Sequence, residues 1–365
     1  ENVRKSELTR EKQRLLWEVR LSMKQQSILA DKDFCKTMDT DVLPFLEQIG
    51  FQGYLSLKDG TYKQRPLSAC KDRYLTRPNC LYYEAYLPKR PIGAVVISHG
   101  FSESIEKYKE VIFYFAASGY QVYLADHPGH GRSLRYTDHP CMVHIDHFES
   151  YTRALHDFVT KVVIPSADSL PLFLYGHSMG GCIAASYLET YPKVFRGAVL
   201  SSPMLGINMG PFPEPCAHAL GFLMTKTGNG SRYAPGQKAF CKGERFEDSC
   251  SSCFERFHYY HEKRERIPLL QTSGSSYAWA YESLCACRKI LKKGNCEKIT
   301  VPLLVFRSAS DSLVKPSAIS RFVSKVPSAR LITISGSRHE IYNSPSCVLE
   351  PYYREIFTFL GNIKD

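Results

Sequence analysis

The chain has 365 residues, enough for one large domain or two smaller ones. Its 44% hydrophobic and 23% charged residues exclude an intrinsically disordered or fibrous protein. The formal net charge of +11 favours anionic partners, but the basic residues are scattered and form no nucleic-acid-binding motif, so we expect no nucleic acid as a partner.

The longest apolar stretches, such as residues 111–118, are far shorter than the roughly 20 residues that cross a bilayer. We therefore expect no transmembrane helix and a cytoplasmic protein. The first residue is Glu1 rather than Met, which leaves open that an upstream signal or anchor was removed. The positive charge leaves open a peripheral contact with an anionic membrane surface.

Residues 1–52 are expected to form a charged N-terminal helical extension. Leu8, Leu15, Val19 and Met23 recur at spacings of seven, four and four residues, which is a helical stripe. The stripe is expected to pack on the rest of the protein. A basic amphipathic helix lying on a membrane surface is the alternative.

Residues 53–57 and 81–87 have the pattern of two strands of a hairpin. The segment 58–80 between them is rich in Pro, Lys and Arg and is too long for a hairpin turn. We interpret it as an inserted loop.

From residue 92 onward, short apolar runs alternate with helical patterns. Residues 92–98 are apolar and β-branched and lead to Gly100, which predicts a buried strand. Further strands are expected at 121–125, 172–175 and 196–201, and helices at 103–118, 148–163 and 179–191. This alternation predicts an α/β fold with a mostly parallel sheet and helices on both faces.

The alternation stops near Pro203 and resumes near residue 299. Strands are then expected at 301–306 and 330–335, and helices at 316–326 and 351–360. We therefore expect a core built from residues 53–203 and 299–365, interrupted by an inserted helical lid at 204–298 with helices near 255–265 and 277–291. The lid is expected to turn apolar side chains toward the active site: Phe212, Phe222, Leu223, Met224, Tyr277 and Trp279.

Thirteen cysteines are present, so at least one is unpaired if all the others form disulfides. The pairs Cys250–Cys253 and Cys285–Cys287 have some likeness to zinc half-sites, but their spacing is loose. We favour free thiols over disulfides or zinc, and we expect no metal and no cofactor.

The strongest chemical signal is the sequence GHSMGG at residues 176–181. Ser178 stands between a predicted strand and a predicted helix, with Gly two residues before it and two after. A sharp strand-to-helix turn leaves room only for small residues at those positions and projects the serine hydroxyl above the sheet. We predict that Ser178 is a nucleophile.

A serine nucleophile needs a base, and the base needs an orienting acid. Asp311 and His339 follow the strands predicted at 301–306 and 330–335, so both are expected at the edge of the sheet where α/β sites form. His177 is expected to point away from Ser178 as a packed structural residue. The histidines inside the insertion are expected to lie off that edge: His218, His258 and His261.

Acyl transfer also requires N–H donors for the developing oxyanion. One is expected from the backbone of Met179, directly after the nucleophile. The other is expected from Phe101, because Gly100 lets the loop after its strand turn inward. Residues 126–133, DHPGHGRS, contain two histidines but no third ligand, so we interpret them as a structural turn rather than a metal site.

Together these segments resemble the monoacylglycerol lipase and bacterial lysophospholipase group of α/β-hydrolases, which is similar to the serine aminopeptidase S33 enzymes. The resemblance rests on six motifs: HG at 99–100, DHPGHGRS at 126–133, GHSMGG at 176–181, SSPM at 201–204, SASD at 308–311 and RHE at 338–340. It implies the α/β-hydrolase fold, a lid formed by the inserted block, and catalysis by Ser178, Asp311 and His339. The segment 58–80, the charged N-terminus and the lid cysteines depart from the pattern.

The expected function is hydrolysis of the acyl ester of a single-chain lipid, either a lysophospholipid or a monoacylglycerol. Lys263, Arg264 and Arg266 favour a phosphate headgroup, and neutral monoacylglycerol is the alternative. A serine aminopeptidase or general carboxylesterase stays open, because Glu103 could hold a free amine. A non-catalytic ligand receptor on the same fold is expected to lack one of the three catalytic residues.

Overall fold

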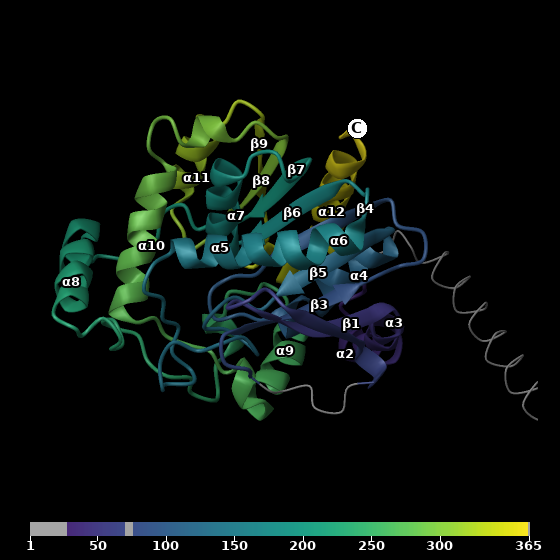
Figure 1. The fold of residues 1–365 in the computed structure, drawn as a ribbon, viewed down its shortest axis with the longest axis horizontal. Helices are drawn as coiled ribbons and strands as arrows, with labels where there is room; N and C mark the ends of the chain where they lie inside the picture. Colours follow the sequence, from purple (N-terminus) through teal and green to yellow (C-terminus); the bar gives the residue numbers. More distant parts are fainter. Residues whose placement is uncertain (1–27, 70–75, 364–365) are drawn as a thin grey trace, which may run out of the picture.

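Nine strands form one sheet in the computed structural model, which describes residues 28–69 and 76–363. The strands lie in the order β2-β1-β3-β5-β4-β6-β7-β8-β9 (Figure 1). Their bounds are β1 Gly50–Ser56, β2 Tyr62–Pro66, β3 Cys80–Tyr86, β4 Gly93–Ser98, β5 Tyr120–Ala125, β6 Leu172–His177, β7 Gly197–Ser201, β8 Leu303–Ser308 and β9 Ala329–Ile334. The six strands from β5 to β9 along the sheet are parallel, while β2, β1 and β3 form an antiparallel edge.

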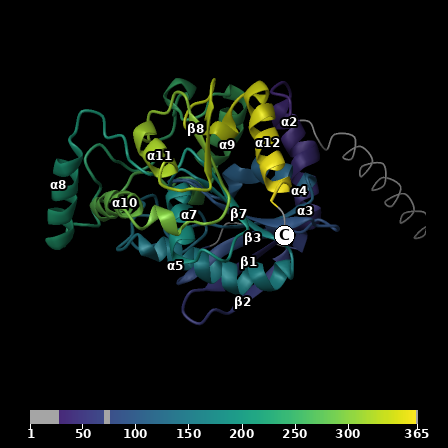
Figure 2. The same cartoon turned by 90° about the horizontal axis from the view of Figure 1, so that it is seen from above.

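Helices cover both faces of this sheet (Figures 1 and 2). Their bounds are α2 Phe34–Thr37, α3 Leu43–Ile49, α4 Lys109–Ala117, α5 Glu149–Phe158, α6 Ile164–Ala167, α7 Met179–Thr190, α8 Glu214–Lys226, α9 Phe254–Arg266, α10 Tyr277–Ile290, α11 Pro316–Val323 and α12 Ser346–Gly361. π-helical turns at Met38–Val42 and Val159–Val163 join α2 to α3 and α5 to α6. The predicted α/β fold with a mostly parallel sheet is confirmed.

Alternating side chains of the central strands divide the core into two clusters. In β4, Val96 packs with α5, α7, α10 and α11, while Val95 and Ile97 pack with α2, α3, α4 and α12. This follows from the two-residue repeat of a strand, since successive side chains point to opposite faces. A strand covered on both sides must be apolar throughout, which is why residues 93–98 are continuously buried.

Because β5, β4 and β6 are parallel neighbours, their carboxyl ends lie close together at one edge of the sheet. β4 lies between β5 and β6, so the connections after β4 and after β6 leave toward opposite sides of the sheet. The carboxyl ends of parallel strands flank a crevice at such a point. The loop after β4 and the turn after β6 are therefore neighbours, although about 80 residues separate them in sequence.

Several sequence-based boundaries differ from the observed ones. The segment 58–80 is not a plain loop, because β2 pairs with β1 along the sheet edge. The helix predicted at 103–118 begins with a 3₁₀ turn, Ile105–Tyr108, before α4. α12 starts at Ser346 rather than Pro351, and its first turns bury Leu349 in the core. α8 had no sequence-based prediction. The predicted N-terminal stripe at 8–23 lies outside the described residues.

The inserted block 204–298 is divided between two places. α8 and α10 lie side by side next to α7, and α9 lies apart from them, next to α2 (Figure 1). α9 is attached by Arg256, whose side chain is completely buried. Its Nε and Nη2 donate to the Glu110 carboxylate on α4 at 3.0 and 2.8 Å, and its Nη1 pairs with Asp31. Asp31 also accepts from the backbone N–H of Ser346 at 2.9 Å, so one guanidinium connects α9 with α4, α12 and the segment before α2.

Replacing Arg256 by Gln is expected to lower the free energy of unfolding by about 3–5 kcal/mol, because it leaves the Glu110 carboxylate buried without a counterion. Denaturant unfolding followed by circular dichroism measures this loss. Arg266→Gln on the same helix is the matched control, since the Arg266 side chain is 71% exposed. The double change Glu110→Gln with Arg256→Gln should recover part of the loss. Equal stability of the Arg256 and Arg266 variants would contradict the assignment.

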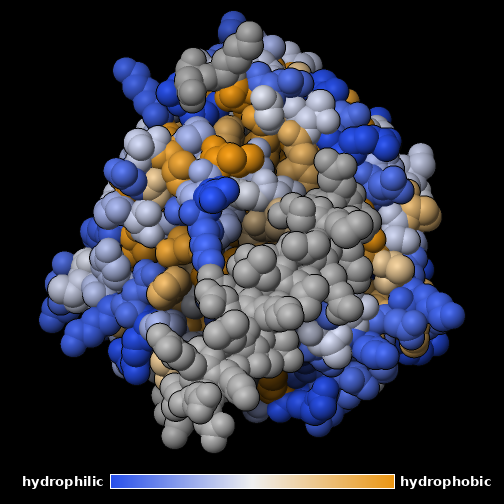
Figure 3. Space-filling view, turned by 90° about the vertical axis from the view of Figure 1, so that its right-hand side faces the viewer, coloured by the Kyte–Doolittle hydropathy of each residue, from blue (hydrophilic) through white to orange (hydrophobic). Residues whose placement is uncertain are grey.

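No helix within residues 28–69 and 76–363 is long and apolar enough to cross a bilayer. On the face in Figure 3, hydrophilic side chains (blue) follow the outline and hydrophobic ones (orange) are interspersed among them. The described residues contain no cluster of metal-ligating side chains, and the cysteines among them are free thiols.

Candidate active site

Ser178 occupies a strained turn between β6 and α7. Its backbone angles are φ 52° and ψ −119°, a combination that L residues rarely adopt. A Cβ atom at Gly176 would come within 2.7 Å of the Gly180 carbonyl oxygen, and one at Gly180 within 2.0 Å of the Ser98 carbonyl oxygen. Larger residues cannot fit at either position. The glycines on both sides of the serine are thus required by the close approach of β4, β6 and α7.

The structure brings Ser178, His339 and Asp311 into one hydrogen-bonded chain. Asp311 follows β8 and His339 follows β9, so both side chains lie at the same sheet edge as Ser178. The distance from His339 Nε2 to Ser178 Oγ is 2.8 Å, and from His339 Nδ1 to Asp311 Oδ2 it is 2.7 Å. A carboxylate can only accept, so Nδ1 carries the proton and Nε2 is free to accept the serine proton.

Asp311 is held in its ionised form. Burial alone would raise its pKa, but the hydrogen bond from His339 and the backbone N–H groups of Val314 and Leu313 lower it below the ordinary value. Those N–H groups donate to Asp311 Oδ1 at 3.1 and 2.9 Å, which leaves Oδ2 for the imidazole. The carboxylate is therefore both charged and fixed in orientation.

The loop after β4 is fixed beside Ser178 by Glu103. The Gly100 N–H donates to Glu103 Oε2 at 2.7 Å, and the Gly100 carbonyl oxygen accepts from His99 Nδ1 at 2.8 Å. With both polar groups of Gly100 occupied, the following residue, Phe101, is held at the mouth of the site. Among the described residues, neither the Phe101 nor the Met179 N–H donates to another backbone group outside helices and strands.

Both carboxylate oxygens of Glu103 are occupied by donors from within the protein. Oε2 also accepts from the Tyr108 hydroxyl at 2.6 Å, and Oε1 accepts from the Tyr342 hydroxyl at 2.6 Å and lies 3.1 Å from Lys107 Nζ. Burial opposes ionisation, but the charge of Lys107 and these hydrogen bonds hold the pKa of Glu103 well below its usual range. This carboxylate supports the loop rather than facing a ligand alone.

His177 and the turn at 126–133 are structural, as expected from the sequence. Burial lowers the pKa of His177 to about 3, so its ring is neutral, and its Nδ1 contacts the Ser201 carbonyl oxygen at 3.1 Å. Asp126 accepts from the backbone N–H groups of Ile105 and Arg132, both at 2.8 Å. This carboxylate ties the turn to the start of the helical segment and does not contact His339.

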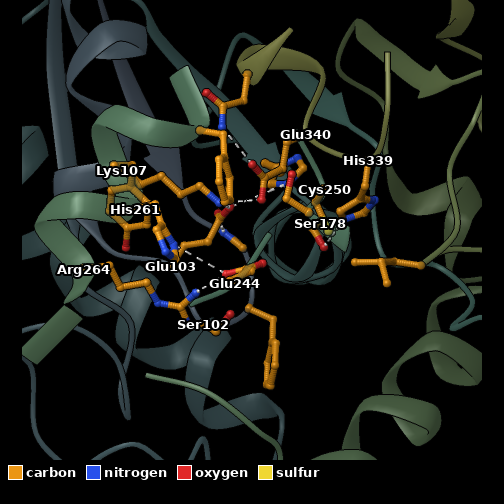
Figure 4. A pocket seen from close by; sticks show the side chains of 18 residues that line it. Ser102, Glu103, Lys107, Ser178, Glu244, Cys250, His261, Arg264, His339 and Glu340 are labelled. Carbon is orange, nitrogen blue, oxygen red and sulfur yellow. Dashed lines mark hydrogen bonds and ion pairs between the residues drawn. The ribbon is translucent and has the colours of Figure 1, made fainter. Parts of the chain in front are cut away.

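A cavity of about 150 Å³, with several charged side chains in its lining, opens beside Ser178 and His339 (Figure 4). α9 and the segment before it form one wall, through Phe257, Tyr260, His261, Arg264, Glu244 and Cys250. The core supplies the opposite wall, through Gly100, Phe101, Glu103, Lys107, Leu313 and Glu340. Of these side chains, only Phe101, Glu103 and Arg264 were expected at a site from the sequence. Glu340 was within reach, since it follows His339 directly, but Lys107 and Glu244 carry no local motif.

The inserted block covers the site differently from the expectation. Of the apolar side chains predicted to face the mouth, Trp279 packs on Phe101 with ring centroids 4.4 Å apart. Phe212, Phe222 and Leu223 do not line the cavity, and they are 45%, 44% and 57% exposed. The reason is that α8 packs on α10 at the outer side of the molecule, while the polar helix α9 reaches the cavity.

The basic residues and the histidines of the inserted block also lie differently from the expectation. Of the three basic residues predicted near a headgroup, only Arg264 lines the cavity; Lys263 lies over the Tyr259 ring, and Arg266 points to solvent. Of the three histidines expected off the sheet edge, His261 does reach the cavity wall. His218 and His258 do not line it. His339 remains the histidine in contact with Ser178.

Comparison with known proteins identifies the family and the fold. The family model described as serine aminopeptidase, S33, matches residues 89–346. The chain is 28% identical over 322 residues to the probable lysophospholipase L2 of Haemophilus influenzae, covering 88% of this chain and 95% of that protein. It is 29% identical over 272 residues to the monoacylglycerol lipase of Mycolicibacterium smegmatis, covering 73% and 88%. The crystal structure of Paleococcus ferrophilus monoacylglycerol lipase shares the fold, with a TM-score of 0.60, 23% identity and coverage of 77% and 98%.

Proposed function

The chain belongs to the serine aminopeptidase S33 family of α/β-hydrolases, and on that basis we propose that it hydrolyses the acyl ester of single-chain lipids through Ser178, His339 and Asp311. It is a carboxylic ester hydrolase by class, because the relatives that match most of its length are a lysophospholipase and a monoacylglycerol lipase. The observation that carries the proposal is the continuous hydrogen-bonded chain from Ser178 Oγ to the buried carboxylate.

In the proposed reaction, Ser178 Oγ attacks the ester carbonyl carbon while His339 Nε2 takes the hydroxyl proton. The charge that develops on the carbonyl oxygen is stabilised by the backbone N–H groups of Phe101 and Met179. The carbon–oxygen bond to the alcohol then breaks, and His339 gives the proton to the leaving alkoxide. Water then loses a proton to His339 and attacks the acyl carbonyl carbon. The bond to Ser178 Oγ breaks, the fatty acid leaves, and His339 returns the proton to Ser178 Oγ. Asp311 holds the imidazole and balances its positive charge.

The two sides of Ser178 suit the two halves of such a substrate. The alcohol must leave next to His339, and the cavity with charged side chains is on that side, with Glu340 and Asn343 in its wall. An acyl chain in that cavity would desolvate several charges without pairing them. Phe101 lines the cavity and also packs on Trp279, and these two rings are the apolar wall proposed for the acyl chain.

Two alternatives are weaker. An aminopeptidase needs an acidic group for a free amine, but Glu103, which suggested this activity, has both oxygens occupied by internal donors. A non-catalytic receptor has no need of a serine, histidine and aspartate at hydrogen-bonding distance. Screening the purified protein against monoacylglycerols, lysophospholipids, short esters and aminoacyl amides tests the proposal. Turnover of the amides alone would overturn it.

We also propose the domain organisation expected from the sequence, with the core at 53–203 and 299–365 and a cover at 204–298. The contact of Trp279 with Phe101 and the position of α9 over the cavity support a covering role. The proposed N-terminal extension covers residues 1–52. Its part at 28–49 packs on the core through Phe34, Met38 and Leu46.

The net charge of +11 supports a peripheral contact with anionic membranes, where single-chain lipids are found. Binding to vesicles that contain phosphatidylglycerol is expected to weaken between 0.1 M and 1 M salt, because the Debye length shrinks from about 10 Å to about 3 Å. Co-sedimentation with these vesicles measures the effect, and pure phosphatidylcholine vesicles are the control. Binding that is independent of salt would exclude an electrostatic contact.

A further inference from the structure

We propose that Arg264 and Glu244 select lipids with a zwitterionic headgroup, in which a phosphodiester is joined to an ammonium group. Both side chains line the cavity next to Ser178 (Figure 4). The inference rests on the proposed ester hydrolysis, since it concerns the alcohol that leaves beside His339. It names lysophospholipids with choline or ethanolamine, rather than monoacylglycerol or anionic lysophospholipids, as the preferred class.

Arg264 has donor capacity left for a phosphate. Its Nη1 donates to Glu244 Oε2 at 3.3 Å and its Nη2 to the Thr272 carbonyl oxygen at 2.8 Å. Its Nε is buried and has no hydrogen-bond partner among the described residues. Each terminal nitrogen of the guanidinium carries two N–H groups and uses one of them in these two bonds, so one N–H on Nη1 and one on Nη2 remain for a phosphate. The guanidinium lies over the Phe240 ring at 4.7 Å, which holds its plane in position at the cavity wall.

Glu244 offers the complementary negative charge. Within the described residues, its hydrogen bond from Arg264 and its 3.9 Å approach to His261 Nδ1 both involve Oε2. Its side chain is 36% exposed, whereas that of Arg264 is 14% exposed, so the carboxylate lies nearer the opening. A cation and an anion side by side match a headgroup that carries a phosphate and an ammonium group a few ångströms apart.

The other charges of the cavity are already used. Lys107 lies between Glu103 and Glu340, and Glu340 Oε2 also accepts from Asn343 at 3.0 Å. With two cationic side chains and three carboxylates, the lining is not positive overall. A purely anionic headgroup would therefore meet repulsion from Glu244, while a zwitterion pairs with both members of the Arg264–Glu244 pair.

The test compares kcat/KM for three esters with the same short acyl chain: lysophosphatidylcholine, lysophosphatidic acid and 1-monoacylglycerol. Arg264→Gln is expected to lower the ratio of lysophosphatidylcholine to monoacylglycerol about tenfold, the loss expected for one charge-assisted hydrogen bond. Glu244→Gln should lower the ratio of lysophosphatidylcholine to lysophosphatidic acid by a similar factor. Ratios measured on one preparation do not depend on the fraction of protein that is folded.

Arg266→Gln and Glu262→Gln are the matched controls, because these residues form an exposed pair at 3.6 Å on the same helix outside the cavity. Their substrate ratios should equal those of the wild type. Unchanged ratios in both cavity variants would overturn the inference, as would a wild type that hydrolyses monoacylglycerol but not lysophosphatidylcholine; either result leaves the proposed function standing. Absence of Ser178-dependent turnover of all three esters would overturn both.

Discussion

Replacing Ser178 by Ala is expected to lower kcat for ester hydrolysis by about 10⁶-fold, the scale found when the nucleophile of a serine–histidine–aspartate triad is removed. The hydroxyl oxygen lies 2.8 Å from His339 Nε2 at the start of α7, and alanine has no atom that could form the acyl-enzyme at this position. The fold should be unaffected for two reasons. Alanine is no more strained than serine at these backbone angles, and the Ser178 hydroxyl does not cap the helix α7. Steady-state kinetics and thermal unfolding measure the two quantities.

Labelling with a fluorophosphonate probe separates this role from general damage to the site. The wild type is expected to be labelled and the Ser178→Ala protein is not. Ser324→Ala, at the exposed C-terminal end of α11, should be labelled like the wild type. If Ser178→Ala and wild type were labelled equally, another residue would be the nucleophile.

Asp311→Asn is expected to lower kcat by about 10⁴-fold. The Asp311 carboxylate accepts the Nδ1 proton of His339 at 2.7 Å, and its pKa is held below the usual value, so it is ionised at neutral pH. An amide lacks the charge that stabilises the imidazolium, and it allows the tautomer in which Nε2 is protonated and cannot accept the serine proton. The kcat of folded protein, checked by circular dichroism, measures the loss.

Asp126→Asn is the comparison that tests the choice of acid. Asp126 is completely buried and accepts from the backbone N–H groups of Arg132 in its own turn and of Ile105 before α4, so its replacement should reduce stability more than kcat. A larger loss of kcat in the Asp126 variant than in the Asp311 variant would mean that Asp126 is the orienting carboxylate.

The central strands and the nucleophile turn were predictable because their signals are local. The buried strands β4 to β7 are short apolar runs bounded by Gly or Pro, and their observed ends fall within two residues of the predicted ones. The turn at Ser178 depends on Gly176 and Gly180, which neighbour it in sequence. Asp311 and His339 were accessible by the same reasoning, because each follows a recognisable strand.

Elements at the edge of the structure were harder to predict. β2 has almost no buried residues, so it lacks the alternation that marks a strand, and only its pairing with β1 makes it one. α8 contains Gly221 and stands among Gly and Pro residues, and it buries little except against α10. Neither segment has the regular spacing of apolar residues from which a strand or a helix can be predicted.

The sequence by itself determined the fold class, the strand-to-helix turn at Ser178 and the order of the serine, aspartate and histidine, because each depends on neighbouring residues or on the end of one strand. The wall of the cavity was decided only by tertiary packing. Arg256 attaches α9 to Glu110 and Asp31, and Arg264 on this helix lines the cavity next to Ser178, where it pairs with Glu244. Such a juxtaposition has no period and no motif in the sequence, since the residues that meet there are far apart along the chain and come together only when the core has formed.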